Sequence, residues 1–282
     1  MNNKAIFSVD LEDWFNILGY KINDNIDLWV HSESQIELMA EETLTFLDAN
    51  NIKATFFCLF YFANKYPDLI KKISRNGHEI ASHGYFHKRL NLLSLEDIQK
   101  ELFESKKILE DITGSKILGY RSPGFSKFND QEYFYDKCIE AGYEYDSSIS
   151  LIHNRLNNEK NNKFLNKDYY INDYGKLKLF KINIIDNILS PFSYNGGTFI
   201  RFTPYFIIKN SVKNKKIKNL SIFYIHPREL YPRHIKINNI SFKKKLNYYY
   251  GLNSVKKKYS LIFKNFNFSK FNQIINNDQN NI

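Results

Sequence analysis

Residues 54–82, ATFFCLFYFANKYPDLIKKISRNGHEIAS, contain the pattern that decides the fold. The run at 54–60 is short and almost wholly apolar, as in a buried strand. Residues 63–75 then show the apolar spacing of a helix, which Gly77 ends. HEIAS at 78–82 predicts a second short strand. A strand, a helix and a strand in succession predict a βαβ unit with parallel strands.

The same alternation continues on both sides of this unit. Ser94, with Asp97 three residues later, is a capping-box signal for the start of a helix that runs to Gly114. Repeated βαβ units predict an α/β fold closed into a barrel. The other expected strands are 5–9, 116–120, 143–145, 176–182 and 220–225, and the other expected helices are 34–50, 130–141 and 203–215.

The composition fits a globular protein with a large core. The chain has 282 residues and 43% hydrophobic residues, and no run approaches the roughly 18–20 apolar residues of a membrane-spanning helix. The apolar run before Asp10 is too short for a secretory leader, so we expect a cytoplasmic protein. Cys58 and Cys138 are too few for a disulfide framework and are expected to be reduced core thiols.

Charge is distributed unevenly along the chain. Residues 1–200 carry 23 Lys and Arg against 28 Asp and Glu, a net of −5, whereas residues 201–282 carry 17 against 2, a net of +15. This asymmetry predicts either an anionic partner for the C-terminal part or a solvated lysine-rich surface. The rhythm of strands and helices breaks near 150–178, which we interpret as an insertion. We therefore expect a barrel over 1–230 and a basic extension packed on it over 231–282.

Ionisable residues gather where the predicted strands end. The C-terminal ends of the strands in an α/β barrel meet at one rim, where active sites are built. Because ionisable residues follow five of the predicted strands, we expect these residues to form one site. The residues are Asp10, Glu12, Asp13, His83, His87, Arg121, Asp146 and His226.

Two histidines and a group of acids have the composition of a metal site. His83 and His87 are four residues apart, which lets both rings reach one ion, although such a pair is often structural. A carboxylate would complete a site with an open position for water. Asp10 and Glu12 share a face of a strand, so one can bind metal while the other acts as a general base. A helix N-terminus would also favour these acids, but three acids within four residues repel one another without a cation.

Further residues have the chemistry that a hydrolytic site needs. Arg121 can hold and orient a free carboxylate. The turn after it, through Gly124, can present backbone N–H groups to an oxyanion. His226 can supply a proton from the last strand.

These residues occur in five ordered motifs that resemble those of a known family. The motifs are SVDLED (8–13), SHGYFH (82–87), RSPGF (121–125), YDSS (145–148) and FYIHP (223–227). In this combination the chain resembles the polysaccharide deacetylases, the NodB-homology group also called carbohydrate esterase family four. It is most similar to the exopolysaccharide-associated branch, because GGTFIRFTP (196–204) precedes the last motif and a basic extension follows it.

The resemblance implies a distorted (β/α)7 barrel and a role for each matching residue. The metal carboxylate usually follows the base directly, and that position here is Leu11. We therefore expect Glu12 to be the ligand, with Asp13 as the alternative. The implied roles are base for Asp10, metal ligands for His83 and His87, orientation of the base for Arg121 and acid for His226.

The implied reaction is metal-dependent hydrolysis of an N-acetyl group on a sugar in a polysaccharide or glycan precursor. One divalent ion, expected to be Zn²⁺, would lower the pKa of its water toward about 7. Gly124 is expected at the oxyanion, and Phe125, Trp14 and Asp146 near the substrate. The aromatic side chains can equally pack in the core.

Other functions remain open from the sequence. The same chemistry can act on a small N-acyl sugar or another linear amide, and the same fold can serve a non-catalytic carbohydrate-binding protein. Nucleic acid is not expected, because no reading motif accompanies the lysines. The basic extension can instead meet an anionic lipid- or nucleotide-diphosphate carrier, at the inner face of a membrane.

Overall fold

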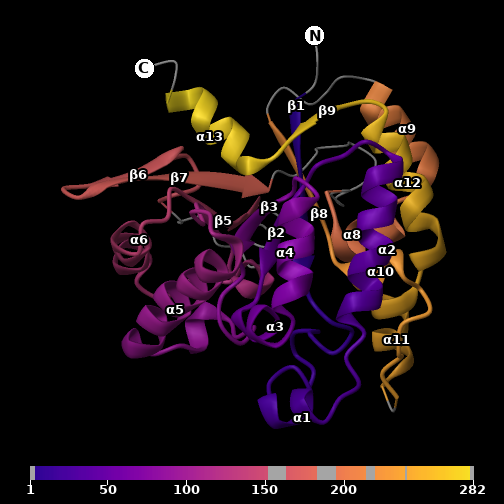
Figure 1. The fold of residues 1–282 in the computed structure, drawn as a ribbon. Coiled ribbons are helices and arrows are strands. Elements are labelled where there is room, and N and C mark those ends of the chain that lie inside the picture. The colour runs from indigo at the N-terminus through magenta and orange to yellow at the C-terminus, as the bar shows by residue number, and fades with distance from the viewer. Residues whose placement is uncertain (1–3, 152–162, 183–194, 214–219, 239, 280–282) are drawn as a thin grey trace. The chain divides into compact units, whose positions relative to one another are not determined.

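The computed structural model describes residues 4–151, 163–182, 195–213, 220–238 and 240–279 (Figure 1). The chain divides into two compact units, one of residues 1–54 and 183–269 and the other of residues 55–182 and 270–282. The C-terminal extension contributes to both units, and the expected boundary at residue 230 stays a prediction. Part of the expected insertion, residues 152–162, lies outside the described residues.

The described residues of the first unit contain three parallel strands. β1 (Lys4–Leu11) pairs with β8 (Ser221–Ile225), with Ala5 opposite Ser221 and Val9 opposite Ile225, and its start pairs with β9 (Asn267–Ser269). β1 and β8 therefore end side by side, and the residues after them lie together. The helices of this unit are α1 (Ile26–Val30), α2 (Ile36–Ala49), α8 (Gly197–Phe202), α9 (Tyr205–Lys213), α10 (Pro227–Leu230), α11 (Phe242–Tyr249) and α12 (Val255–Phe263).

The second unit contains a sheet in the order β6-β7-β5-β4-β3-β2. Its neighbours are parallel except β6 and β7, which form an antiparallel hairpin. The strands are β2 (Thr55–Cys58), β3 (Glu79–Ser82), β4 (Gly119–Tyr120), β5 (Tyr145–Ser150), β6 (Tyr169–Asn172) and β7 (Gly175–Ile182). The helices are α3 (Phe60–Lys65), α4 (Pro67–Arg75), α5 (Leu95–Thr113), α6 (Gln131–Glu140) and α13 (Phe271–Gln279). The α/β class with mainly parallel strands is confirmed, and closure into a barrel stays a prediction.

Helix ends follow the local sequence signals. Ser94 and Asp97 form the predicted capping box, and Gly114 ends α5 in the left-handed conformation with a φ of 64°. The helix expected over 63–75 is instead two helices, because Pro67 begins α4 directly after Tyr66 ends α3.

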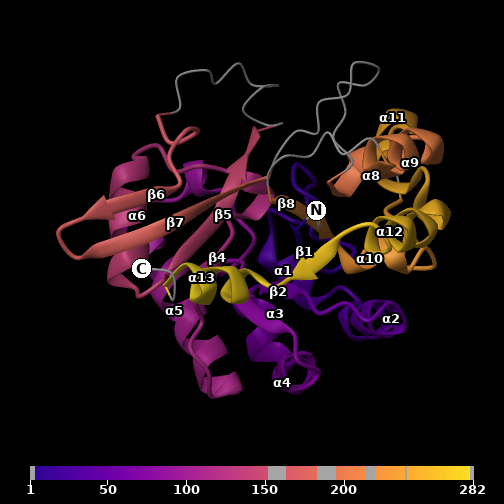
Figure 2. The same cartoon turned by 90° about the horizontal axis from the view of Figure 1, so that it is seen from above.

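The C-terminal extension packs on the apolar side of β1 in the first unit. Phe7 makes edge-to-face contacts with Tyr259 and Phe263 of α12, at centroid distances of 5.2 and 4.9 Å. α12 also packs beside α9, which Figure 2 shows from above. The extension is therefore part of the core of this unit.

Two other composition-based expectations concern the cysteines and membrane helices. Cys58 and Cys138 are buried free thiols, as expected. Among the described helices none is long and apolar enough to cross a bilayer.

Candidate functional site

Three side chains of the first unit meet where β1 and β8 end. Asp10 lies near the end of strand β1 and Glu12 directly follows the strand, and they are 2% and 3% exposed. His226 directly follows β8. One ligand atom from each of the three lies within 4.8 Å of the others. The prediction that Asp10, Glu12 and His226 share a site is thus supported by their geometry within this unit.

Glu12 has a cationic neighbour and a histidine neighbour. Arg228 Nη1 donates to Glu12 Oε2 at 2.8 Å, and His226 Nε2 lies 3.5 Å from Glu12 Oε1. The positive charge of Arg228 favours the ionised form of the buried carboxylate. Arg228 was not among the predicted site residues.

Asp13 has a different environment from Glu12. One of its oxygens accepts from Ser34 Oγ at 2.6 Å, and the other accepts from Trp14 N at 2.7 Å. Gln35 N also donates to this carboxylate, at the start of α2. Burial raises the pKa of Asp13, and the hydrogen bonds from Ser34 and the backbone oppose that rise. The contacts describe a carboxylate that ties the loop after β1 to α2.

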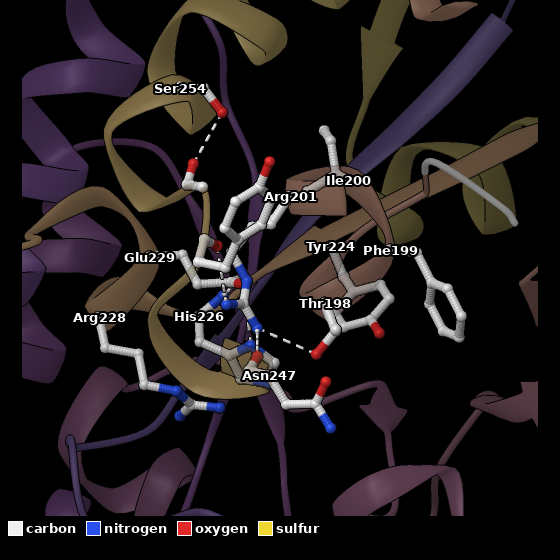
Figure 3. A network of polar contacts seen from close by, with 12 residues as sticks. Thr198, Phe199, Ile200, Arg201, Tyr224, His226, Arg228, Glu229, Asn247 and Ser254 are labelled. Carbon is white, nitrogen blue, oxygen red and sulfur yellow. Dashed lines mark hydrogen bonds and ion pairs between the residues drawn. The ribbon is translucent and has the colours of Figure 1, made fainter. Parts of the chain in front are cut away.

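A second carboxylate, that of Glu229, lies next to His226. Glu229 Oε2 accepts from His226 N at 3.1 Å and lies 3.3 Å from His226 Nδ1. Arg201 Nε donates to Glu229 Oε1 at 3.1 Å (Figure 3). Burial raises the pKa of Glu229, but the hydrogen bond and charge of His226 and the charges of Arg201 and Arg228 outweigh it and lower the pKa to about 2. Glu229 was not among the predicted site residues, although His226 and Glu229 have capping-box spacing.

The glycines of the GGTFIRFTP segment explain how Arg201 reaches this position. A Cβ on Gly196 would lie 2.2 Å from Tyr224 O, and one on Gly197 would lie 2.7 Å from the Tyr224 hydroxyl. Gly197 also has a φ of 54°. Only glycine lets this segment run against β8 and begin α8, which carries Arg201.

The second unit contains the histidine pair, in the loop after β3. His83 and His87 are each 1% exposed, and their ring centroids are 5.5 Å apart. His83 Nδ1 lies 2.8 Å from Arg121 O. A carbonyl only accepts, so Nδ1 carries the proton and Nε2 keeps its lone pair, as in a metal-binding histidine. His87 adopts a φ of 50°, an uncommon conformation outside glycine that often marks functional sites.

A buried glutamate supports this loop. Glu101 of α5 accepts from Tyr85 N at 2.9 Å through Oε2 and from the Tyr120 hydroxyl at 3.1 Å through Oε1. Burial raises the pKa of Glu101 to about 7, against the opposing hydrogen bonds from Tyr85 and Tyr120. No sequence pattern indicates this role, because Glu101 occupies an ordinary helical position.

Arg121 is fully buried beside a bulge in β5. Its Nη2 donates to Ser147 Oγ at 3.0 Å, and its guanidinium lies 4.0 Å from the centroid of the Phe57 ring. The pairing of β5 with β7 shifts between Asp146 and Ile149, so Ser147 lies in the bulge. The predicted pairing of Arg121 with the base stays a prediction.

The position of Asp146 corrects the sequence analysis. It was expected after a strand over 143–145, but β5 is Tyr145–Ser150, so Asp146 lies near the start of the strand with no exposure. Ser148 Oγ and Ser148 N donate to it at 2.5 and 3.0 Å. Burial raises the pKa of Asp146 to about 6, although Ser148 and Arg121 oppose it. These contacts describe an anchor for the bulge.

The remaining predicted residues differ in exposure. Phe125 N donates to Ser122 O at 3.1 Å. Phe125 is partly exposed and has a φ of 54°. Trp14 is 9% exposed and its Nε1 donates to Glu33 O at 2.9 Å. Its burial favours the core-packing alternative over stacking on a sugar.

The donor set suits a divalent metal ion. Carboxylate oxygens and imidazole nitrogens are the ligands of catalytic zinc sites, and both kinds are buried here. A buried group of acids at the end of a parallel strand is also stabilised by a nearby cation. The residues present therefore fit such an ion.

Two family models match the chain in succession. Residues 33–145 match the polysaccharide deacetylase model, and residues 153–276 match a domain of unknown function (DUF3473). The first range contains His83, His87 and Arg121, and the second contains Arg201 and His226.

Comparison with individual proteins also points to the polysaccharide deacetylases. Residues of this chain are 29% identical to the peptidoglycan-N-acetylmuramic acid deacetylase PdaA of Bacillus subtilis over 124 residues, which is 44% of this chain and 46% of that protein. The match thus spans less than half of the relative. A structure of a putative polysaccharide deacetylase from Mycobacterium smegmatis aligns with a TM-score of 0.65 at 17% identity, over 97% of this chain and 88% of that one. A CE4 family pseudoenzyme from Bacillus anthracis aligns with a TM-score of 0.52 at 11% identity, over 96% and 64%.

Residues 33–145 therefore match the polysaccharide deacetylase family, and the chain has the fold of solved structures of that class. Because a pseudoenzyme shares the fold, activity has to be argued from the side chains.

Proposed function

We propose that this protein is a metal-dependent carbohydrate deacetylase, which hydrolyses an N-acetyl amide on an amino sugar. The observation that carries the proposal is the group formed by buried Asp10, buried Glu12 and half-buried His226, whose ligand atoms lie within 4.8 Å of one another. A base, a ligand and an acid are the groups that this hydrolysis needs. A non-catalytic relative on the same fold has no need to keep them.

Three residues are proposed to hold the metal ion, namely Glu12, His83 and His87. The protonated Nδ1 of His83 leaves Nε2 for the ion. Glu12 is preferred to Asp13, because the oxygens of Asp13 are already occupied by Ser34 and by backbone N–H groups. When bound, the ion supplies Lewis acidity and lowers the pKa of water.

The protein side chains then carry the proton transfers. Asp10 takes a proton from the attacking water, and Arg121 is proposed to keep this carboxylate ionised and oriented. The Gly124 N–H donates to the oxyanion that forms on the acetyl carbon. As the C–N bond breaks, His226 Nε2 gives a proton to the leaving nitrogen, so the products are acetate and a free amine.

The substrate is proposed to be a polysaccharide or a glycan precursor, as in the exopolysaccharide-associated branch. A precursor on a lipid or nucleotide diphosphate would be anionic, and Lys243, Lys244 and Lys245 are exposed on α11. The second lysine triplet is excluded from this role at two positions, because Lys258 is 5% exposed and Lys256 pairs with Glu42. We therefore place any contact with a carrier, or with an anionic membrane on the cytoplasmic side, at the first triplet.

The test combines metal analysis with acetate release. Protein loaded with Zn²⁺ is assayed on N-acetylglucosamine oligomers, nucleotide-linked N-acetyl sugars and lipid-linked N-acetyl sugars. We expect one equivalent of metal and release of acetate from at least one class. Glu12→Gln should weaken metal binding strongly and Asp13→Asn should not. Absence of acetate release from the whole panel by metal-loaded protein would contradict the proposal.

The lysine triplet has its own test. Replacing Lys243, Lys244 and Lys245 by glutamine should raise KM for a diphosphate-linked substrate at low salt and leave KM for an uncharged oligomer unchanged. An equal KM on both substrates before and after the change would remove the triplet from substrate binding.

A further inference from the structure

A chain of buried polar contacts joins the C-terminal extension to His226 (Figure 3). We propose that Glu229 and Arg201 are positioning residues for the His226 imidazole, and that the C-terminal extension holds Arg201 in place for this purpose. The inference rests on the proposed function, in which His226 is the general acid. All the residues concerned belong to the first unit.

Glu229 contacts His226 at two points. A single oxygen, Oε2, lies within hydrogen-bonding distance of both the backbone nitrogen and Nδ1 of His226, at 3.1 and 3.3 Å. An ionised carboxylate only accepts, so Nδ1 must donate. Fixing Nδ1 in this way turns Nε2 toward Glu12, 3.5 Å away. The nitrogen proposed to protonate the leaving group is thereby aimed at the acidic group at the end of β1.

Arg201 fixes the other oxygen of Glu229. Its Nε donates to Glu229 Oε1, and the two side chains are 5% and 3% exposed. Its Nη2 donates to Thr198 Oγ1 at 3.0 Å and to Asn247 O at 2.7 Å, and its Nη1 donates to Tyr250 O at 3.2 Å. Every nitrogen of the guanidinium therefore has an acceptor, and only arginine has this fork of donors. The two carbonyls come from the extension, at the end of α11.

The extension also holds the helix that carries Arg201. Lys258 Nζ donates to Ile200 O and Arg201 O, both at 2.8 Å, among the last carbonyls of α8. A buried cation at this end of a helix meets carbonyls that have no partner within the helix. A Cβ on Gly251 would lie 2.7 Å from Arg201 O, so the chain passes closely there. The extension thus contacts both the side chain and the backbone of Arg201.

This arrangement gives the extension a role in the reaction. If the lysine-rich tail were only a solvated surface, we would expect Lys258 to be exposed. We would also not expect two carbonyls of the tail to accept from one guanidinium. The chain of contacts runs from the extension through Arg201 and Glu229 to His226. Disturbing it should lower the rate of the chemical step without changing how substrate binds.

The test compares two variants with a control on the same extension. Arg201→Lys keeps the charge but cannot make the four contacts at once. Glu229→Gln keeps the shape but replaces one acceptor oxygen by an NH₂ group. We expect kcat to fall by about 10- to 100-fold in each, the usual loss when an orienting partner is removed, with KM unchanged. Lys264→Gln, at the exposed C-terminal end of α12 in the same extension, should leave both constants unchanged.

The assay conditions separate an effect on stability from an effect on the positioning of His226. Rates are measured at a temperature at which circular dichroism shows each variant to be fully folded. If the ion pair only stabilised the fold, the variants would have a lower Tm but an unchanged kcat. The double variant should lose about as much kcat as either single variant, because the two residues act in one chain of contacts. Unchanged kcat in folded Glu229→Gln and Arg201→Lys would overturn the inference.

A second measurement does not depend on activity. Long-range ¹H–¹⁵N spectra of the wild-type protein should show the proton of neutral His226 on Nδ1. In Glu229→Gln the remaining oxygen should face the charged Arg201, so the NH₂ group faces Nδ1 and the proton should move to Nε2. If the wild-type protein released no acetate, only the proposed function would be refuted. If His226 had the same tautomer in the wild type and in Glu229→Gln, the positioning role would be refuted.

Discussion

Arg201→Met should destabilise the folded protein strongly, because it leaves the buried carboxylate of Glu229 without the guanidinium that donates to it. Removing one partner of a buried ion pair costs about 3–5 kcal/mol. His226, Arg201 and Arg228 together lower the pKa of Glu229 from 4.5 to about 2. Each pKa unit corresponds to about 1.4 kcal/mol, so the surroundings stabilise the ionised form by about 3 kcal/mol. We therefore expect the free energy of unfolding to fall by about 3–5 kcal/mol.

Urea unfolding at pH 7 measures this loss, with Arg233→Met as the matched control. Arg233 is exposed in the same unit, so its replacement should change stability by less than about 0.5 kcal/mol. The folded pKa of Glu229 is depressed, so its contribution is present above about pH 4.5 and is lost as pH falls toward 2. The stability difference between wild type and Glu229→Gln should shrink over that range. A loss below 1 kcal/mol for Arg201→Met, or a difference that grows as pH falls, would refute the reasoning.

Three further predictions follow from the site. His83→Ala and His87→Ala should each lose bound metal and acetate release together, and full metal occupancy by elemental analysis in both would remove the pair from the metal site. Gly196→Ala should lower Tm, because the added Cβ would lie 2.2 Å from Tyr224 O, and an unchanged melting curve would contradict the close approach of this segment to β8. Glu101→Gln should cost about 1–3 kcal/mol in urea unfolding at pH 8, since one of the two donors to this carboxylate loses its acceptor. Equal stability would show that the loop after β3 does not depend on it.

Local signals made most of the fold predictable from the sequence. The capping box at Ser94 and Asp97 and the left-handed Gly114 need only neighbouring residues, and both occur as predicted. The break at Pro67 was also visible in the sequence, since proline cannot continue a helix. β5 was placed too early, because the polar residues after Asp146 lack the alternation of a half-buried strand and form part of a bulge.

Long-range contacts account for what the sequence could not supply. The acids after β1 and His226 after β8 were predicted to share a site, because parallel strands end together. The pairing of Arg201 with Glu229 joins residues 28 positions apart, and no periodicity links them. The use of Lys258 as a buried donor to α8 was likewise invisible, since lysine is rarely buried and the triplet resembled a surface charge run.

The most direct test of the proposed function compares acetate release by metal-loaded wild type and Asp10→Asn. An asparagine cannot accept the proton of the attacking water, and Asp10 is proposed to be the base and not a ligand. We predict that the variant retains one equivalent of metal and the fold but releases acetate at less than about 1% of the wild-type rate, within the usual range for loss of a general base. Wild-type activity in Asp10→Asn, or loss of its metal, would contradict the account.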